Sequence, residues 1–372
     1  MKSGIVLLVC IALLCTFLLS ACTATQTSGK NPVSSLAAES QALSISSTSS
    51  VVVESQALST DSTLSAETSS TATSSSETSS AATSSAAISS KGSSTSAATS
   101  SKGSTSGNIS VNEKSAKIVI MSQNVRCGDD GNGNDIVDRA PRLKKLIEKY
   151  SPDIIGTQET TPTWNKYFRD TFKKTYGMVG KNRDGETATW GEWGTILYKL
   201  DRFELLDSDD FWLTDTPTEV SKISGSWCNR ICTWALLKDK VTGKTFVFAN
   251  THLDVGSESV RVKQFEYLLK GLADLMEQYP VFLTGDFNTT PTSPVYAEAI
   301  TKFADPYNSA KENRSTVNYT YHAYGTLAPG SLIDFCFYNK NKADAFWYKI
   351  ADDDFGGYVS DHYGVVGEFL LK

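Results

Sequence analysis

The sequence has no excess of positive charge. Its 35 Lys and Arg residues stand against 41 Asp and Glu, which gives a formal net charge of −6 at pH 7. Within residues 111–372 the balance is 31 basic to 36 acidic residues. Tight non-specific binding of nucleic acid needs a clear basic excess, so the charge excludes that class of binding protein. It leaves nucleases open, because a bound divalent cation can supply positive charge at the phosphate.

Cysteine is scarce after the first 22 residues. Four of the seven cysteines lie in that part of the chain: Cys127, Cys228, Cys232 and Cys336. So few cysteines do not form a disulfide scaffold, even where an extracellular address permits bridges. The string Cys228-Asn-Arg-Ile-Cys232 lacks the second pair of Cys or His ligands that a zinc site needs. Core thiols or one disulfide are therefore favoured over a zinc centre.

Long apolar runs are absent as well. The longest, Ile5–Leu19, has 15 residues, fewer than the roughly 20 that span a bilayer as a helix. Because this run follows Lys2 at the N-terminus, we interpret residues 1–22 as a signal peptide. It ends in Leu19-Ser20-Ala21-Cys22, which resembles the lipobox of bacterial lipoproteins, in which the cysteine is acylated. An incidental thiol beside an ordinary cleavage site is the alternative.

Residues 23–110 contain almost no aromatic residue and consist largely of Ser, Thr and Ala. Such a segment cannot bury enough apolar surface to offset the entropy of ordering, so we predict a disordered linker. The expected organisation is a lipoprotein signal peptide (1–22), this linker (23–110) and one folded domain (111–372). An acylated Cys22 would anchor the protein, which we expect to be monomeric, to the outer side of the cytoplasmic membrane at the bacterial cell surface.

Strand-like and helix-like stretches alternate in the folded part. Arg139–Tyr150, with Asp138 as N-cap and Pro141 in the first turn, and Ser257–Gln278 both have the apolar spacing of helices. Apolar runs predict strands at 117–125, 153–158, 193–198, 231–237, 245–250, 281–284, 332–338 and 365–370. Successive strands between 193 and 250 have no helix between them, which favours antiparallel or mixed sheets. We therefore predict an α/β fold in which two such sheets pack together with helices outside.

Polar side chains stand at the ends of these apolar strands, where a sheet presents them to a cleft. They are Asn124, Glu159, His252, Asp286, Asn288, Asp334, Asp361 and His362. They include two of only three histidines in the chain. If the acids converge, two carboxylates 4 Å apart repel by about 4 kcal/mol at an effective dielectric of about 20. The cluster then needs a cation, raised pKa values or histidinium neighbours, and oxygen ligands favour Mg²⁺ or Mn²⁺, or Ca²⁺, over zinc.

In order and spacing, these residues resemble the endonuclease/exonuclease/phosphatase superfamily with its deoxyribonuclease I-like fold. The matching strings are Ser-Gln-Asn124, Gln-Glu159, Gly-Glu192, Asn-Thr-His252-Leu, Gly-Asp286-Phe-Asn288, Ile-Asp334-Phe and Ser-Asp361-His362. The resemblance covers residues 117–372 and implies a four-layer α/β sandwich that hydrolyses phosphoester bonds with Mg²⁺. The family's late motif usually has Tyr after the aspartate; Phe335 stands there instead, so one hydroxyl is missing.

The resemblance also implies a primary metal site at Glu159, with Asn124 near it. Asp334 and Asp361 are the further acids expected at the ion, and Asp286 would orient or deprotonate the attacking water. These roles suit the reaction, because the negative oxygens of a phosphodiester repel nucleophiles. Its site must supply positive charge, a water activator and an acid for the leaving alkoxide.

Asn288 would hold a phosphate oxygen, and each imidazole would have a carboxylate partner. The resemblance assigns Asp361 to His362 and Glu192 to His252. Histidine can donate a proton near neutral pH if a carboxylate keeps it protonated. The two imidazoles would therefore stabilise the equatorial phosphoryl oxygens or protonate the leaving group.

Other polar and aromatic residues have more than one interpretation. Asp334 and Asp254 could be turn or cap residues, and His322 could be a packed or rim residue. Arg230, just before the strand at 231, would contact a substrate phosphate or pair with a neighbouring acid. The tryptophans in the middle of the domain could pack in the core or stack on a base, a sugar or a lipid headgroup: Trp190, Trp193, Trp212, Trp227 and Trp234.

The leading interpretation is a surface-anchored, Mg²⁺-dependent phosphodiesterase, namely a nuclease that degrades external DNA or RNA. A phosphatase or phospholipase-type hydrolase acting on a sugar phosphate, an inositol phosphate or a sphingomyelin-like headgroup is the alternative. A binding or adhesion module without activity is disfavoured, because the set of catalytic side chains is complete.

Overall fold

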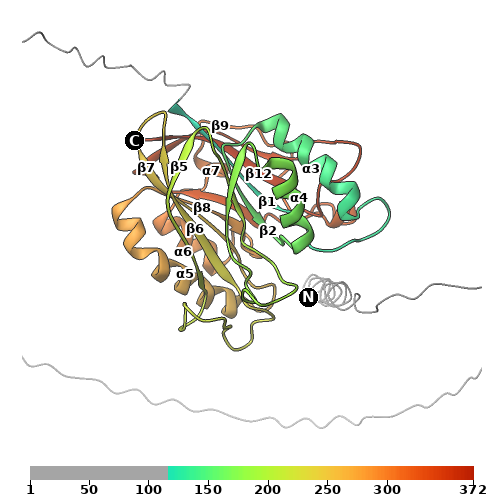
Figure 1. The fold of residues 1–372 in the computed structure, drawn as a ribbon, viewed down its shortest axis with the longest axis horizontal. Coiled ribbons are helices and arrows are strands. Elements are labelled where there is room, and N and C mark those ends of the chain that lie inside the picture. The colour runs from blue at the N-terminus through green and yellow to red at the C-terminus, as the bar shows by residue number, and fades with distance from the viewer. Residues whose placement is uncertain (1–115) are drawn as a thin grey trace, which may run out of the picture. The chain divides into compact units, whose positions relative to one another are not determined.

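The computed structural model describes residues 116–372 (Figure 1). The predicted signal peptide, the acylated Cys22 and the linker at 23–110 lie outside the described residues and stay predictions. Each helix within residues 116–372 is too short or too polar to cross a membrane.

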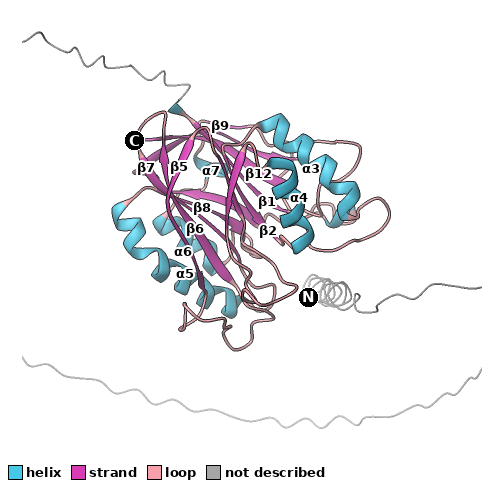
Figure 2. Ribbon diagram, in the orientation of Figure 1, coloured by secondary structure: helices cyan, strands magenta, loops and turns pink. Residues whose placement is uncertain are grey.

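Two mixed β-sheets form the centre of the domain (Figures 1 and 2). One contains β1 Ile118–Asn124, β2 Ile154–Gln158, β3 Tyr176–Val179, β4 Ile196–Lys199, β9 Glu312–Asn313, β11 Ala343–Ala351 and β12 Gly364–Leu371. The other contains β5 Phe203–Trp212, β6 Ile231–Asp239, β7 Thr245–His252, β8 Val281–Asp286 and β10 Asp334–Tyr338. Their strand orders are β3-β4-β2-β1-β12-β11-β9 and β10-β8-β7-β6-β5. The pairs β1–β2, β7–β8 and β9–β11 are parallel and the others antiparallel.

Helices cover the outer faces of both sheets, as Figures 1 and 2 show. They are α3 Ile136–Tyr150, α4 Pro162–Phe172, α5 Glu258–Gln278, α6 Pro294–Lys302 and the short α7 Pro306–Ser309. On α3 and α4, Leu143 and Trp164 are buried in one cluster with Ile155 and Val366 of the seven-stranded sheet. The apolar side of α5 belongs to the main core with the five-stranded sheet. The predicted α/β fold of two sheets between outer helices is confirmed.

A close approach between the sheets sets the position of the strand ends. A Cβ on Gly156 of β2 would lie 2.3 Å from Thr284 Oγ1 and 2.5 Å from Asn250 Oδ1, so only glycine fits there. Beside it, Gln158 Nε2 donates to Asn250 Oδ1 at 2.8 Å, and Asn250 Nδ2 donates to the Thr157 carbonyl at 2.8 Å. These buried bonds tie β2 to β7 directly below the predicted cluster of acids.

The structure extends and corrects the predicted elements. Helix α3 begins at Ile136, three residues before the prediction, and Asp135 rather than Asp138 is its N-cap. The reason is that Ile136 is buried against the sheet and donates its N–H to Asp129 Oδ1 at 2.7 Å, so the chain gains a packed and satisfied first turn. Pro141 consequently lies inside the helix instead of in its first turn.

Several elements had no prediction at all, notably β5, β11, α4 and α6. Strand β5 carries Glu204, Asp207, Asp209 and Asp210 and stands at the edge of its sheet. Charged side chains are tolerated on an edge strand, and they hide the apolar alternation that predicts a strand. Of the cysteines, Cys228, Cys232 and Cys336 are free thiols, so no disulfide joins Cys228 to Cys232.

Candidate active site

Strand register brings three of the predicted residues side by side. His252 ends β7 and Asp286 ends the parallel strand β8, where the two are register partners. Asp334 begins β10 and is the register partner of Asp286 on the other side. Three adjacent strands therefore present His252, Asp286 and Asp334 at one level of the five-stranded sheet.

Asp286 lies at the centre of the site. Its Oδ2 is 3.6 Å from His252 Nε2, 3.8 Å from His362 Nε2, and accepts a 3.0 Å hydrogen bond from Asn124 Nδ2. Its Oδ1 accepts from the backbone N of Asn288 at 2.9 Å. The carboxyl thus stands between the two catalytic imidazole candidates, and Asn124 links it to the other sheet.

The buried carboxyl of Asp286 keeps its proton to a higher pH than an ordinary aspartate does. Burial and the neighbouring charge of Asp334 raise its pKa to about 7, although His362 opposes the shift. A carboxylate with a pKa near the working pH is suited to accept a proton from water. This fits the water-activating role predicted for Asp286.

His362 is paired with Asp334, not with the predicted Asp361. Its Nδ1 lies 2.8 Å from Asp334 Oδ2. Neighbouring residues of an extended segment point to opposite sides, and His362 is extended where it bridges to Tyr321. The side chain of Asp361 instead accepts from Ser360 Oγ at 3.1 Å.

The pairing makes His362 a stable cation. Burial alone would lower the pKa of His362, but Asp334, with help from Asp286, raises it to about 10. The imidazolium therefore persists at neutral pH with Nε2 directed toward Asp286. It can donate a hydrogen bond or a proton there.

His252, in contrast to His362, is neutral. Burial lowers the pKa of His252 well below its ordinary value, and the positive charges of Arg230 and Arg183 lower it further. Asn288 Nδ2 donates to the Leu253 carbonyl at 3.0 Å and lies 3.0 Å from His252 Nε2. Since the amide nitrogen is a donor, Nε2 accepts and the proton of the neutral ring lies on Nδ1. With both amide protons used, Asn288 orients His252 here instead of offering a donor to phosphate.

Glu192 lies beside His252 as predicted, but the contact is loose. Its Oε2 is 3.7 Å from His252 Nδ1, whereas Arg183 NH1 donates to the same oxygen at 2.5 Å. Burial raises the pKa of Glu192, against the opposing charge of Arg183. The carboxylate of Glu192, which the resemblance assigned to His252, is thus paired with Arg183.

Glu159 directly follows β2 and takes a left-handed backbone conformation with φ of 58°. That conformation is costly for a residue with a side chain and is often found at functional sites. The carboxylate accepts from Asn124 Nδ2 at 3.0 Å and from the Cys127 backbone N at 2.9 Å. Burial alone would raise the pKa of Glu159, but the charge of Arg126 and the hydrogen bonds from Asn124 and the Cys127 backbone hold it below its ordinary value.

Glu159 and Asp361 fit a hard divalent cation best. Oxygens of both acids lie 3.8 Å from the guanidinium of Arg126. Burial raises the pKa of Asp361, which the charges of His362 and Arg126 only partly offset. Buried carboxylates of this kind match the oxygen ligands that Mg²⁺ and Mn²⁺ take in proteins.

Two other predicted ligands are less suited to the ion. Asn124 turns its nitrogen to the carboxylates while its Oδ1 accepts from the Arg126 backbone N at 2.9 Å, so it positions the acids. Asp334 could offer an oxygen within 4.8 Å of ligand atoms on Asp286 and His362. However, the imidazolium of His362 already neutralises Asp334 and would repel a cation.

The remaining sequence candidates fall into structural and peripheral positions. Asp254 is fully buried and accepts from Ser226 Oγ at 2.8 Å and the Trp227 N at 3.0 Å, so it braces a loop. Arg230 Nε is 3.8 Å from Asp254 Oδ2, and the same side chain lines a small pocket beside His252. His322 is packed, with its ring 4.0 Å from that of Tyr363.

Sequence reasoning missed Arg126 and Arg183. Arg126 is 7% exposed and its guanidinium bonds Asp130 through Nε at 3.1 Å and NH2 at 3.0 Å. The only signal was its position two residues after Asn124, at the end of a strand. Arg183 lies in the loop after β3, directly after the isolated bridge residue Asn182, so nothing in the local sequence marks it.

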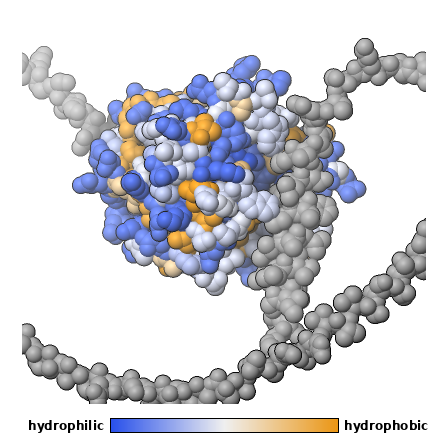
Figure 3. All heavy atoms as spheres, turned by 90° about the horizontal axis from the view of Figure 1, so that it is seen from below, coloured by the Kyte–Doolittle hydropathy of each residue, from blue (hydrophilic) through white to orange (hydrophobic). Residues whose placement is uncertain are grey.

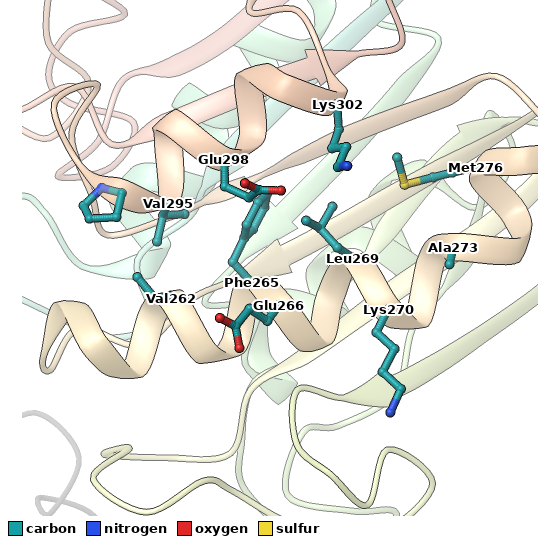
Figure 4. Close-up of a pocket in the computed structure, with 11 residues that line it drawn as sticks. Val262, Phe265, Glu266, Leu269, Lys270, Ala273, Met276, Val295, Glu298 and Lys302 are labelled. Carbon is teal, nitrogen blue, oxygen red and sulfur yellow. The ribbon is translucent and has the colours of Figure 1, made fainter. Parts of the chain in front are cut away.

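A wider groove lies elsewhere. It has a volume of about 760 Å³ and runs between α5 and α6, where Figure 4 shows Phe265, Leu269 and Val295 with Glu298 and Lys302 at its border. None of the predicted catalytic residues lines it. The face seen in Figure 3 is largely hydrophilic with separate apolar patches. The acid and imidazole cluster is therefore the candidate active site.

Known proteins resemble this chain over its described part. The model of the Endonuclease/Exonuclease/phosphatase family matches residues 121–362. Nocturnin of Rattus norvegicus is 26% identical over 305 residues, which cover 68% of this chain and 66% of the rat protein. Human nocturnin is 28% identical over 205 residues, or 48% of this chain and 44% of the human protein. The chain thus spans less than two thirds of these curated relatives.

Among the solved structures that match, two align over nearly their own whole length. An endonuclease/exonuclease/phosphatase from Bacteroides vulgatus has a TM-score of 0.65 and 28% identity, covering 69% of this chain and 99% of that chain. A mannosyl-6-phosphatase from Bacteroides thetaiotaomicron has a TM-score of 0.63 and 26% identity, covering 68% of this chain and 99% of that chain.

Proposed function

The chain belongs to the endonuclease/exonuclease/phosphatase family and is a phosphoester hydrolase; we propose that it is a Mg²⁺- or Mn²⁺-dependent phosphodiesterase, namely a nuclease. The observation that carries this proposal is the position of Asp286 between two imidazoles, the neutral His252 and the positively charged His362. One group is ready to take a proton and another is ready to give one. Hydrolysis of a phosphoester by water needs both.

In the proposed reaction, water attacks phosphorus while Asp286 takes one of its protons. The new bond forms between the water oxygen and phosphorus, and the bond from phosphorus to the leaving oxygen breaks. His362 gives its Nε2 proton to a leaving alkoxide, and Asp334 stabilises the imidazolium until then. A divalent ion held by Glu159 and Asp361 would supply positive charge to the phosphoryl oxygens.

His252 has a separate part in this scheme. Its neutral ring is fixed by Asn288 on one edge and lies near Glu192 on the other. A neutral Nδ1–H donor avoids the cost of a second buried cation so close to the ion. We propose that His252 orients the substrate, while His362 transfers the proton.

A second candidate function is hydrolysis of a sugar phosphate monoester. The likeness to the mannosyl-6-phosphatase, which covers nearly all of that chain, favours it. The same acids and imidazoles serve a monoester, since the leaving group is again an alkoxide. The two candidates differ in whether the scissile phosphorus carries one ester bond or two.

The purified full chain, assayed with Mg²⁺ or Mn²⁺, tests these proposals. Its substrates would be plasmid DNA, RNA, bis(p-nitrophenyl) phosphate, p-nitrophenyl phosphate, mannose 6-phosphate and sphingomyelin. Cleavage of the diesters supports the nuclease, and cleavage of monoesters alone supports the phosphatase. Undiminished activity in excess chelator would exclude the metal-dependent mechanism.

We also propose that an acyl group on Cys22 anchors the enzyme to the bacterial cell surface, where it would meet external substrates. The support is the lipobox-like string Leu19-Ser20-Ala21-Cys22 after the apolar run. Two acyl chains hold a protein stably on a membrane. A Cys22→Ala variant should appear in the culture medium and not in the membrane fraction, and continued membrane association of that variant would refute the anchor.

A further inference from the structure

Four buried nitrogens with no hydrogen-bond partner belong to three residues that line one small pocket. They are Arg183 Nε, Arg230 Nε, Arg230 NH1 and His252 Nδ1. All three residues line the same pocket, together with Glu159 and Glu192. Buried N–H groups are nearly always paired, so several unpaired ones around one space indicate an acceptor that binds there.

Each of the four nitrogens is a donor. A guanidinium has no acceptor atom, so the three arginine nitrogens can only donate. His252 Nε2 accepts from Asn288 Nδ2, which places the ring proton on Nδ1. The pocket therefore calls for an oxygen acceptor, because another donor would leave the same groups unpaired.

The pocket adjoins the Nδ1 edge of His252 and the carboxylate of Glu159, whereas Asp286 lies at the Nε2 edge of the ring. The Nε2 edge of the ring faces Asp286 at 3.6 Å, whereas the Nδ1 edge faces Glu192 at 3.7 Å. An oxygen in the pocket is thus separated from Asp286 by the imidazole ring. It belongs to a group other than the phosphoryl that Asp286 helps water to attack.

The volume of the pocket and the charges around it limit which acceptor can bind there. The volume of about 20 Å³ holds one oxygen atom but no ring. Arg183 neutralises Glu192 at 2.5 Å, while Arg230 has only a 3.8 Å contact with Asp254. Asp254 in turn accepts bonds from its own loop. Arg230 is 5% exposed and thus holds a buried charge that an anionic oxygen would pair.

The surrounding loops add flat surfaces next to the pocket. Trp190 and Trp227 are 45% and 42% exposed, unusually open for their size. The loop that carries Trp190 contacts the loop that carries Trp227, because Asn229 Nδ2 donates to Asp184 Oδ1 at 2.9 Å. Exposed indoles on the segments that carry Arg183 and Arg230 can stack on a base or a sugar attached to the anion.

From this arrangement we propose that Arg183, Arg230 and His252 Nδ1 form an anion subsite for a second phosphate of the substrate, adjacent to the scissile one. This inference rests on the proposed function and narrows its substrate class. The preferred substrate is an ester with neighbouring phosphates, such as an oligonucleotide or a bisphosphate, in place of an isolated monoester. One oxygen of the second phosphate enters the pocket and the remainder stays at its mouth.

Substrates that differ by one phosphate test the subsite. The thymidine dinucleotide TpT would be compared with its forms carrying an added 5′- or 3′-phosphate. One added phosphate should raise kcat/KM by about tenfold or more, a factor typical of one charge-assisted contact. In Arg183→Met and Arg230→Met this advantage should fall below about threefold. Arg169→Met, an exposed arginine on α4, should keep it.

Arg230→Lys serves as the second variant if a Met variant does not fold by circular dichroism. It keeps the charge but loses the fork of donors, so it should retain part of the advantage. Two results would overturn the subsite. In the first, an added phosphate does not raise kcat/KM of the native chain. In the second, it raises kcat/KM of the Met variants as much as that of the native chain. These ratios use activity, so a direct binding measurement is also needed.

The three histidines of the chain make that measurement simple. Without divalent ions, inorganic phosphate should shift the side-chain ¹⁵N signals of His252 in the native chain and not in Arg230→Met. Absence of a shift in the native chain means that water alone fills the pocket, and the inference fails. If phosphate shifts His252 while no phosphoester is hydrolysed, the subsite stands and the proposed function fails. If phosphoesters are hydrolysed without the shift, the proposed function stands and the subsite fails.

Discussion

His362 Nδ1 lies 2.8 Å from Asp334 Oδ2, although 28 residues separate the two along the chain and Asp361 is the direct neighbour of His362. The contact joins the start of β10 in one sheet to the segment before β12 in the other. It keeps a buried imidazole charged and directs its Nε2 toward Asp286. The charge state of His362 therefore depends on how the two sheets pack.

Asp334→Asn should lower activity strongly. Without the carboxylate, the pKa of His362 falls from about 10, and the imidazolium no longer persists at neutral pH. We expect kcat to fall by about a hundredfold, the usual effect of losing one proton-transfer or charge-stabilising group. The measurement is steady-state hydrolysis of bis(p-nitrophenyl) phosphate, together with an NMR titration of His362.

Asp344→Asn is the control, since this half-exposed acid pairs with Lys372 away from the site. It should leave both kcat and the titration of His362 unchanged. A native pKa of His362 in Asp334→Asn would contradict the role of the pair, whatever the activity.

The same pair predicts how stability changes with pH. A group whose pKa is higher in the folded than in the unfolded chain adds stability that is complete below the unfolded pKa. For His362 that contribution is lost as pH rises from about 6.5 in the unfolded chain to about 10 in the folded one. Urea denaturation should therefore show stability falling over this interval. The fall should be smaller in Asp334→Asn, and an equal fall in both chains would refute the linkage.

The sequence could identify the strand ends but not their partners. Asn124 and Asp286 each follow an apolar run and His362 precedes one, so their place at the rim of a sheet could be predicted. Which carboxylate meets which imidazole depends on register and on packing between sheets, neither of which is local. The resemblance assigned the adjacent Asp361 to His362, whereas extended backbone turns the two side chains apart.

The arginines show a second limit of sequence reasoning. Arg126 and Arg183 stand among buried acids, yet a lone arginine in a loop has no periodicity or motif to mark it. The edge strand β5 was missed for a related reason, because its acids obscure the apolar alternation. By contrast, α5 was predicted within a residue of its observed bounds, since its apolar face and its Ser257 cap are both local signals.

Cation binding should depend on Glu159 and Asp361. Binding of Mg²⁺ or Mn²⁺ to the folded state alone raises the melting temperature by mass action. We expect this rise in the native chain and its loss in Glu159→Gln and Asp361→Asn. Calorimetric titration of the ion into each chain measures the same effect without any substrate. Glu186→Gln, in an exposed loop, is the control; native ion affinity in Glu159→Gln would place the ion elsewhere.

Asp254→Ala should destabilise the fold. The change leaves the Trp227 N and the Gly256 N without their acceptor and removes one partner of Ser226 Oγ. Each buried unpaired group costs about 1–3 kcal/mol, so we expect a loss of about 3 kcal/mol in the free energy of unfolding. Urea titration followed by tryptophan fluorescence measures it. A stability within 0.5 kcal/mol of native, roughly the range of surface substitutions, would show that the loop needs no such brace.

The most direct test of the proposed mechanism is single-turnover cleavage of bis(p-nitrophenyl) phosphate by Asp286→Asn, with the fold checked by circular dichroism and the ion saturating. The asparagine keeps the shape and can still bond its neighbours, but it cannot take a proton from water. We predict a rate lowered by about a thousandfold or more, with no recovery as pH rises toward 8. A native rate in this variant would contradict the assignment of Asp286 as the group that activates water.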